Sequence, residues 1–156
     1  MKFYWDNVPD ELKTRTQWVG WKYVPNPKNP DKPKKKPIDA KNGKSADVSD
    51  PDTWSTFKTA KTFLKTGKVA GIGFVFTKDD PYVGIDLDNC CDKKTGNLEQ
   101  WADEILEKIS SYTEISPSGT GVHIIVKGKL PGKGKRVGNI EIYDQVRYFT
   151  VTGDIL

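Results

Sequence analysis

The stretch 82–89 constrains the fold most, because it is a short apolar run that ends in two carboxylates. If it forms a strand, successive side chains point to opposite faces, so Asp86 and Asp88 project together while Ile85 and Leu87 enter the core. Adjacent carboxylates repel each other, and burying them without a partner is costly. Mg²⁺ is typically held by one or two carboxylates and would remove that repulsion. The stretch therefore predicts a metal-bearing strand.

A calcium loop is the obvious competitor for such a pair of aspartates. The EF-hand pattern requires D-x-[DN]-x-[DN]-G, and here the last two of these positions are Cys90 and Cys91. Neighbouring cysteines also lack the C-x₂-C spacing of a zinc site, so we interpret them as reduced thiols. The two aspartates therefore still predict a site for a hard divalent cation.

The bulk properties indicate one soluble domain. The chain has 156 residues, of which 35% are hydrophobic, and a net charge of +4. We expect a single domain over residues 1–156, with an N-terminal α/β part in residues 1–70 and the metal-bearing sheet in residues 71–156. No run approaches the roughly 20 apolar residues of a membrane span, and the N-terminus lacks an apolar signal-peptide core. We therefore expect a cytoplasmic protein that does not contact a membrane.

The local patterns predict an α+β fold with an antiparallel sheet and a helix on one face. One helix is expected to start within residues 49–54, with Pro51 at its first position, and to stop at Gly67. Another is expected over residues 98–109 with Asn97 as the cap. A hairpin is expected to join the strands 70–77 and 82–88. Further strands are expected over residues 17–24, 122–127, 139–143 and 147–153.

Positive charge gathers in two proline- or glycine-rich segments, residues 25–37 and 129–138. Such composition predicts exposed irregular loops. One interpretation is a pair of solvated connectors; the other is contact with nucleic-acid phosphates or with a triphosphate. The second interpretation assigns DNA binding to Lys34, Lys35, Lys133, Lys135 and Arg136, and a nucleotide contact to Lys36.

Residues 116–123 place two serines and two glycines just before the only histidine of the chain. Glycine lets backbone N–H groups approach an anion, and hydroxyls add donors. The plain interpretation is a tight turn followed by an edge histidine. The functional interpretation is a triphosphate cradle made by Ser118, Gly119 and His123.

Glu141 interrupts an apolar strand, between Ile140 and Ile142. A strand carboxylate commonly lies on the exposed face of an antiparallel sheet, but inside a sheet it needs a partner. A metal shared with Asp86 and Asp88 would supply one. Arg147, four residues after Tyr143, is a further candidate for a phosphate contact.

The order of these features resembles the archaeo-eukaryotic primase superfamily, specifically the primase-polymerases of phages and plasmids. The apolar strand ending in Asp86 and Asp88 is similar to the family's first motif. The turn from Ser118 to His123 is similar to its second motif, and Glu141 to its third. The resemblance extends through nearly the whole chain, although its specific motifs lie in residues 82–153.

The resemblance implies a template-directed nucleotidyltransferase, a DNA primase and DNA polymerase that replicates a mobile element. It implies an RRM-like antiparallel sheet with flanking helices, and two Mg²⁺ or Mn²⁺ ions held by Asp86, Asp88 and Glu141. His123, Ser118, Gly119, Arg147 and Lys36 would bind the nucleotide. The implied partners are single-stranded DNA, dNTP or NTP, and a helicase domain or protein.

Other functions compete with this one. A rolling-circle endonuclease needs paired histidines and a nucleophilic tyrosine, and the chain has one histidine. A topoisomerase-primase domain has its glutamate before the D-x-D, whereas Glu141 follows it here. A catalytically inactive DNA-binding module of a replication initiator and a nucleotide-binding regulatory domain both stay open as alternatives.

Overall fold

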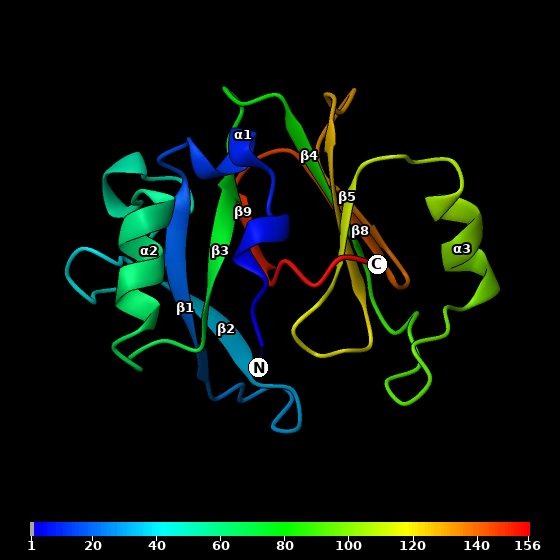
Figure 1. Ribbon diagram of the computed structural model, residues 1–156, viewed down its shortest axis with the longest axis horizontal. Helices are drawn as coiled ribbons and strands as arrows, with labels where there is room; N and C mark the ends of the chain where they lie inside the picture. Colours follow the sequence, from blue (N-terminus) through cyan, green and yellow to red (C-terminus); the bar gives the residue numbers. More distant parts are fainter. Residues whose placement is uncertain (1) are drawn as a thin grey trace.

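The computed structural model describes residues 2–156, which form two antiparallel sheets lying side by side (Figure 1). The first sheet has the strand order β2-β1-β3-β9. Its strands are β1 (Trp18–Val24), β2 (Lys34–Ile38), β3 (Gly71–Phe76) and β9 (Arg147–Val151). β3 is buried along its whole length, as its continuous apolar sequence predicts for a central strand.

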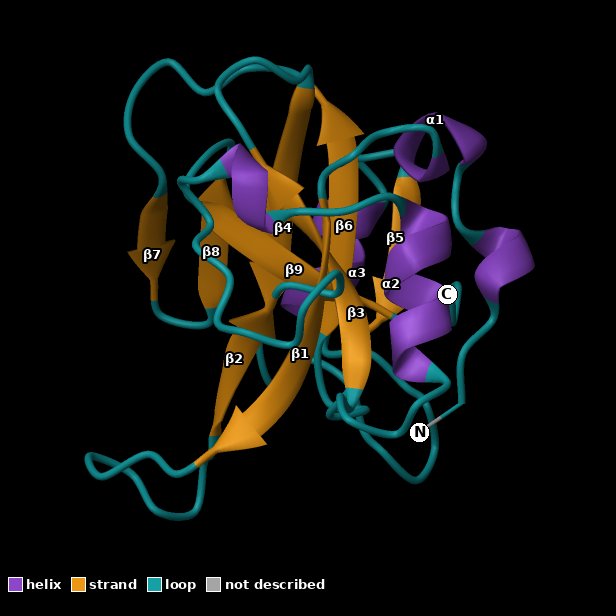
Figure 2. Cartoon of the chain, turned by 90° about the vertical axis from the view of Figure 1, so that its left-hand side faces the viewer, coloured by secondary structure: helices purple, strands orange, loops and turns teal. Residues whose placement is uncertain are grey.

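The second sheet has the strand order β5-β6-β4-β8-β7. Its strands are β4 (Tyr82–Leu87), β5 (Tyr112–Ile115), β6 (Val122–Lys127), β7 (Lys135–Val137) and β8 (Ile140–Tyr143). Figure 2 shows β7 at the outer edge of this sheet, beside β8. The strand that carries the aspartates is therefore central, with neighbours on both sides.

Two helices lie at opposite ends of the molecule, with the sheets between them (Figure 1). α2 (Phe57–Leu64) packs on β1 and β3, and α3 (Gln100–Leu106) packs on the second sheet through Ala102. Shorter helical turns are η1 (Trp5–Asn7), α1 (Asp10–Lys13) and η2 (Pro51–Thr53). The α+β class expected from the sequence is confirmed.

The apolar side chains form a separate cluster for each layer. The largest joins α2 and the first sheet to the beginning of β4, and includes Trp18, Phe74 and Phe149. A second cluster lies between α3 and the sheet, around Leu87 and Ile124. Ile85 and Leu87 are buried as predicted, so the aspartates that alternate with them face the other way.

The predicted hairpin between residues 70–77 and 82–88 is wrong, because β3 and β4 belong to different sheets. The turn between them is built around the buried carboxylate of Asp80. It accepts hydrogen bonds from the backbone N–H groups of Thr77 and Tyr82 and from the side chain of Gln17, each at 2.8 Å. These bonds redirect the chain from one sheet to the next. The boundary expected at residue 70 does not separate the two sheets, because β3 and β9 follow it in the chain and both belong to the first sheet.

The two basic segments are partly strands. Residues 34–38 form β2 and pair with β1, with Pro37 on an edge strand where its missing N–H is tolerated. Residues 135–137 form β7 and pair with β8. Edge strands rich in basic residues discourage pairing with other chains. Because this composition is also typical of loops, the sequence predicted loops at both places.

Both predicted helix starts are also misplaced. Pro51 begins a 3₁₀ turn capped by Asp50, and the helix proper begins at Phe57, where the Thr56 hydroxyl accepts a bond from Thr59 N–H. At α3 the cap position is Glu99, not Asn97, and its side chain makes no capping bond. Ahead of α2, the strong capping residue Asp50 thus forms a local turn and does not begin the helix itself.

None of the helices within residues 2–156 combines the length and the apolar character needed to cross a bilayer.

Candidate active site

One row of paired residues in the second sheet carries an ionisable side chain on every strand. In strand order the row is Glu114, His123, Asp86, Glu141 and Arg136. Side chains of direct cross-strand partners project from the same face. We call these five residues the charged row. Sequence spacing does not reveal this pairing, because the five members come from five strands.

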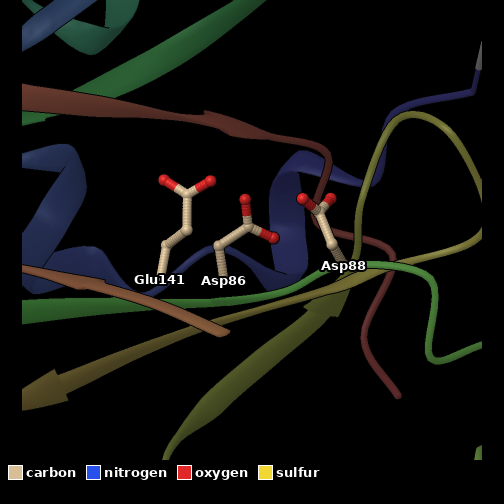
Figure 3. A group of neighbouring side chains, drawn as sticks. All are labelled: Asp86, Asp88 and Glu141. Carbon is tan, nitrogen blue, oxygen red and sulfur yellow. The ribbon is translucent and has the colours of Figure 1, made fainter. Parts of the chain in front are cut away.

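Asp88 joins the middle of the charged row from the residue just beyond β4. One carboxylate oxygen each of Asp86, Asp88 and Glu141 lie within 4.8 Å of one another. Figure 3 shows the three carboxylates side by side, pointing away from the strands that carry them. The structure therefore brings together the three acidic residues that the sequence predicted to share a metal.

The environment of Asp86 is unfavourable for a bare carboxylate. Burial raises the pKa of Asp86, and the nearby Asp88 and Glu141 raise it further, although His123 acts in the opposite direction. Three acids at this spacing need a compensating positive charge.

Part of this charge comes from Arg136 on β7. Its guanidinium donates to Glu141 and, at 3.2 Å, to Asp88. Lys32 lies farther away, with its ammonium 3.9 Å from Asp88. Arg136 is about half exposed, so this pairing lies at the rim of the cluster and leaves Asp86 without a cationic hydrogen-bond partner among the described lysines and arginines.

The donor set fits a hard divalent cation. Carboxylate oxygens are the preferred protein ligands of Mg²⁺ and Mn²⁺, whereas zinc and copper sites use sulfur and imidazole. All three carboxylates keep about a fifth to a quarter of their surface exposed, so a cation and its remaining waters can approach. Asp86, Asp88 and Glu141 are thus suited to hold such an ion.

The acidic cluster lies in a groove of about 860 Å³ between the two sheets. The first sheet contributes Lys35, Tyr148 and Thr150 to it. The second contributes Asp88, Tyr143 and every member of the charged row except Glu114. Tyr148 reaches across the first sheet because Gly73 has no side chain; a Cβ there would lie 2.6 Å from the tyrosine ring. The Tyr148 hydroxyl donates to the Lys35 carbonyl at 2.7 Å, which ties β9 to β2.

Cations surround the acidic cluster within this groove. Lys32, Lys34, Lys35, Arg136 and Arg147 all line it. Lys35 is the least exposed of the three lysines, and burial lowers its pKa while Asp86 and Asp88 counteract part of that effect. The guanidinium of Arg147 lies over the ring of Tyr143, 4.5 Å from its centre. The groove is suited to an elongated anion beside bound cations.

His123 lies next to Asp86 at the floor of the groove. Its Nδ1 is 2.9 Å from the Thr150 carbonyl and its Nε2 is 3.7 Å from an Asp86 oxygen. Burial by itself would lower the pKa of His123, but the neighbouring Glu114 and Asp86 carboxylates outweigh burial and raise it. The buried position contrasts with the edge histidine of the plain interpretation.

Other predicted site residues lie outside the groove. Ser118 and Gly119 line a separate pocket of about 200 Å³ with Lys93. The Ser118 hydroxyl bonds the hydroxyls of Ser116 and Thr120, so this turn is internally bonded. Its glycine at position 121 packs on the end of β4, where a Cβ would lie 2.8 Å from the Leu87 carbonyl.

Three of the predicted basic residues also lie elsewhere. Lys36 is exposed and does not line the groove; it projects from the face opposite Lys35, as neighbours in a strand do. Lys133 and Lys135 are exposed and likewise do not line it. On β7 it is Arg136 that turns toward the acids.

Glu114 is the member of the charged row that the sequence reasoning missed. It lies in β5 between Thr113 and Ile115, and it is 1% exposed. The same signal that singled out Glu141, a carboxylate inside an apolar strand, was present here. Its partnership with His123 depends on strand pairing, which spacing along the chain does not reveal.

No protein-family model matches the chain. Among curated proteins, it is similar to the DNA primase-polymerase of Nitratiruptor phage NrS-1. The two are 40% identical over 150 residues, which cover 92% of this chain and 20% of the phage protein. The chain thus spans about a fifth of the length of that relative. Identity at this level over nearly the whole chain shows that it is related to a phage DNA primase-polymerase.

Proposed function

We propose that this chain is the catalytic domain of a primase-polymerase that copies single-stranded DNA by template-directed nucleotidyl transfer. One observation carries the proposal: three carboxylates from two strands converge within 4.8 Å on the floor of a groove lined by five lysines and arginines. The similarity to a phage DNA primase-polymerase supports the same function. We further propose that the sheet β5-β6-β4-β8-β7 corresponds to the RRM-like sheet of the primase superfamily.

Asp86, Asp88 and Glu141 would hold Mg²⁺ or Mn²⁺, two ions in the proposed scheme. Bound there, the ions would lower the pKa of the attacking 3′-hydroxyl and neutralise the charge that develops on pyrophosphate. Protein groups then contribute position and electrostatic stabilisation, and no side chain acts as a nucleophile.

The remaining groove residues have proposed roles that follow from their places. His123, Lys35 and Arg147 would bind the triphosphate, because they present donors beside the acids. Lys34 and Arg136, nearer to solvent, would contact the DNA backbone together with Lys133 and Lys135 on the neighbouring surface. Ser118 and Gly119 would act at a distance, by fixing the turn that packs against the end of β4. Lys36 would reach only nucleic acid that passes outside the groove.

The whole relative is about five times as long as the matched region, so activity in a cell would involve further parts. A helicase domain or a separate helicase is the partner that we propose, because a primase-polymerase needs single-stranded template.

The test is nucleotide incorporation on primed and unprimed single-stranded DNA with Mg²⁺ and with Mn²⁺. We expect incorporation by the wild-type chain, and background levels for Asp86→Asn and Glu141→Gln. Asp103→Asn, an exposed aspartate on α3, is the matched control and should incorporate normally. Full activity of Asp86→Asn would exclude the proposed metal site.

The alternative is a catalytically inactive DNA-binding module of a replication initiator. The ion pairs of Arg136 with Asp88 and Glu141 favour it, because they supply charge compensation from within the chain. Salt-sensitive binding of single-stranded DNA in a gel shift, with no incorporation under either metal, would support this alternative.

A further inference from the structure

The buried end of the charged row contains a carboxylate that the proposed reaction does not use. Glu114 is 1% exposed, and its carboxylate accepts bonds from the Tyr112 hydroxyl at 2.6 Å and from Gly153 N–H at 2.8 Å. Thr152 N–H donates to both of its oxygens, at 3.1 and 3.0 Å. Burying a carboxylate is costly, and this many donors are what such a group requires.

These donors leave one oxygen of Glu114 directed at His123. The Oε1 atom lies 3.4 Å from Nδ1 of the imidazole. The same Nδ1 lies 2.9 Å from the Thr150 carbonyl, which can only accept a hydrogen bond. Nδ1 must therefore carry a proton, and it points at two acceptors together. This fixes the plane of the ring and directs Nε2 toward the groove, where it faces Asp86 at 3.7 Å.

We infer that Glu114 is a positioning residue, which holds the His123 imidazole with Nδ1–H turned inward and Nε2 presented to the nucleotide. The inference rests on the proposed function, in which His123 contacts the triphosphate. A histidine that acts through one nitrogen commonly has its other nitrogen fixed by a carboxylate or a carbonyl, and this choice sets which tautomer is present. Here His123 has an acceptor of each kind, the Glu114 carboxylate on β5 and the Thr150 carbonyl on β9.

A purely structural role would explain the same burial. The bonds from Thr152 and Gly153 attach the free edge of β9 and its extension to β5, and so help to join the two sheets. If this were the only role of Glu114, its replacement would destabilise the fold and lower nucleotide affinity equally with and without His123. If Glu114 acts through His123, its effect on nucleotide binding must disappear once the imidazole is gone.

The experiment is a double-mutant cycle on nucleotide affinity, measured by titration with Mn²⁺ and single-stranded DNA. We expect Glu114→Gln to weaken nucleotide binding by about 10- to 100-fold, the usual effect of losing such a supporting carboxylate. In the His123→Gln background, adding Glu114→Gln should cause no further loss. Equal losses in both backgrounds would overturn the inference. Thr152→Val is the control, because it removes a hydroxyl bond to the Ile115 carbonyl at the same junction without touching the carboxylate.

A second measurement needs no activity. His123 is the only histidine, so nitrogen-15 NMR of the imidazole reports on it without ambiguity. The wild-type chain should show a protonated Nδ1 whose proton exchanges slowly. In Glu114→Gln that proton should exchange faster, because the Thr150 carbonyl is then the one strong acceptor left beside it. A wild-type spectrum with unprotonated Nδ1 would overturn the inference, even if Glu114→Gln failed to fold. Absence of incorporation by the wild type would instead refute the proposed function, and the spectrum would still decide the role of Glu114.

Discussion

Asp86 of β4 and Glu141 of β8 are direct partners across an antiparallel strand pair, 55 positions apart in the sequence. Like charges directly opposite each other destabilise a sheet. The pair lies on the floor of a basic groove with Asp88 beside it. Such an arrangement costs stability in the absence of a cation, which supports the metal site proposed for these three residues.

The acidic cluster should therefore destabilise the protein when metal is removed. In a chelator, Asp86→Asn should raise the melting temperature by about 2–4 °C, the shift expected for about 1 kcal/mol in a domain of this size. With Mn²⁺ the order should reverse, because only the wild type gains stability from a bound ion. Thermal unfolding with and without Mn²⁺ checks this, with Asp103→Asn as the control. An Asp86→Asn variant that stays less stable than wild type in chelator would contradict it.

Arg136 should compete with metal for the acids. Removing it in Arg136→Ala takes away a half-exposed ion pair worth about 1 kcal/mol or less, so Mn²⁺ should bind up to roughly fivefold more tightly. Single-stranded DNA should bind more weakly, because a cation is lost from the groove rim. Lys135→Ala, its exposed neighbour on β7, should leave Mn²⁺ affinity unchanged. Calorimetric titration measures the change, and weaker Mn²⁺ binding by Arg136→Ala would count against competition.

Lys35 should make anion binding depend on pH. Burial lowers its pKa in the folded chain, so it loses its charge at a pH below the ordinary value of 10.5. Nucleotide affinity should then already fall at a pH below 10.5 in the wild type, and less in Lys35→Arg, which stays charged. Lys36→Arg, on the opposite exposed face, should behave as the wild type does. Fluorescence titrations across this range provide the measurement, and identical pH profiles for all three proteins would refute the prediction.

The same shift has a defined sign for stability. Below pH 10.5 the unfolded chain binds more protons at Lys35 than the folded chain does, so this group makes the free energy of unfolding increase as pH rises through that window. Lys35→Arg should remove the contribution. Denaturant unfolding at several pH values tests this independently of nucleotide binding.

Gly84 of β4 lies against two aromatic rings of the first sheet. A Cβ at this position would lie 2.6 Å from the ring of Phe149 and 2.7 Å from that of Phe76. Overpacking of this kind typically costs about 1–3 kcal/mol, so Gly84→Ala should lower the melting temperature by roughly 2–4 °C for each kcal/mol lost. Gly128→Ala, whose nearest neighbour would be 3.8 Å away, is the control and should change it little. An unchanged melting temperature in Gly84→Ala would show that the rings can move aside.

The sequence by itself determined the α+β class, the alternation that buries Ile85 and Leu87, and the identity of the three acids. These depend on local periodicity and on the cost of an unpaired carboxylate, both of which act between near neighbours. The resemblance to phage primase-polymerases also came from short motifs, and it agrees with the 40% identity to one of them.

The tertiary structure decided which residues meet. The division into two sheets depends on Asp80, whose buried bonds turn a segment that otherwise predicts a hairpin. In the tertiary structure Ser118, Gly119 and Lys36 lie outside the groove, whereas Arg136 and Glu114 belong to the charged row. Strand pairing between distant segments sets all of these positions, and pairing is fixed by the packing of whole sheets, which no local pattern encodes.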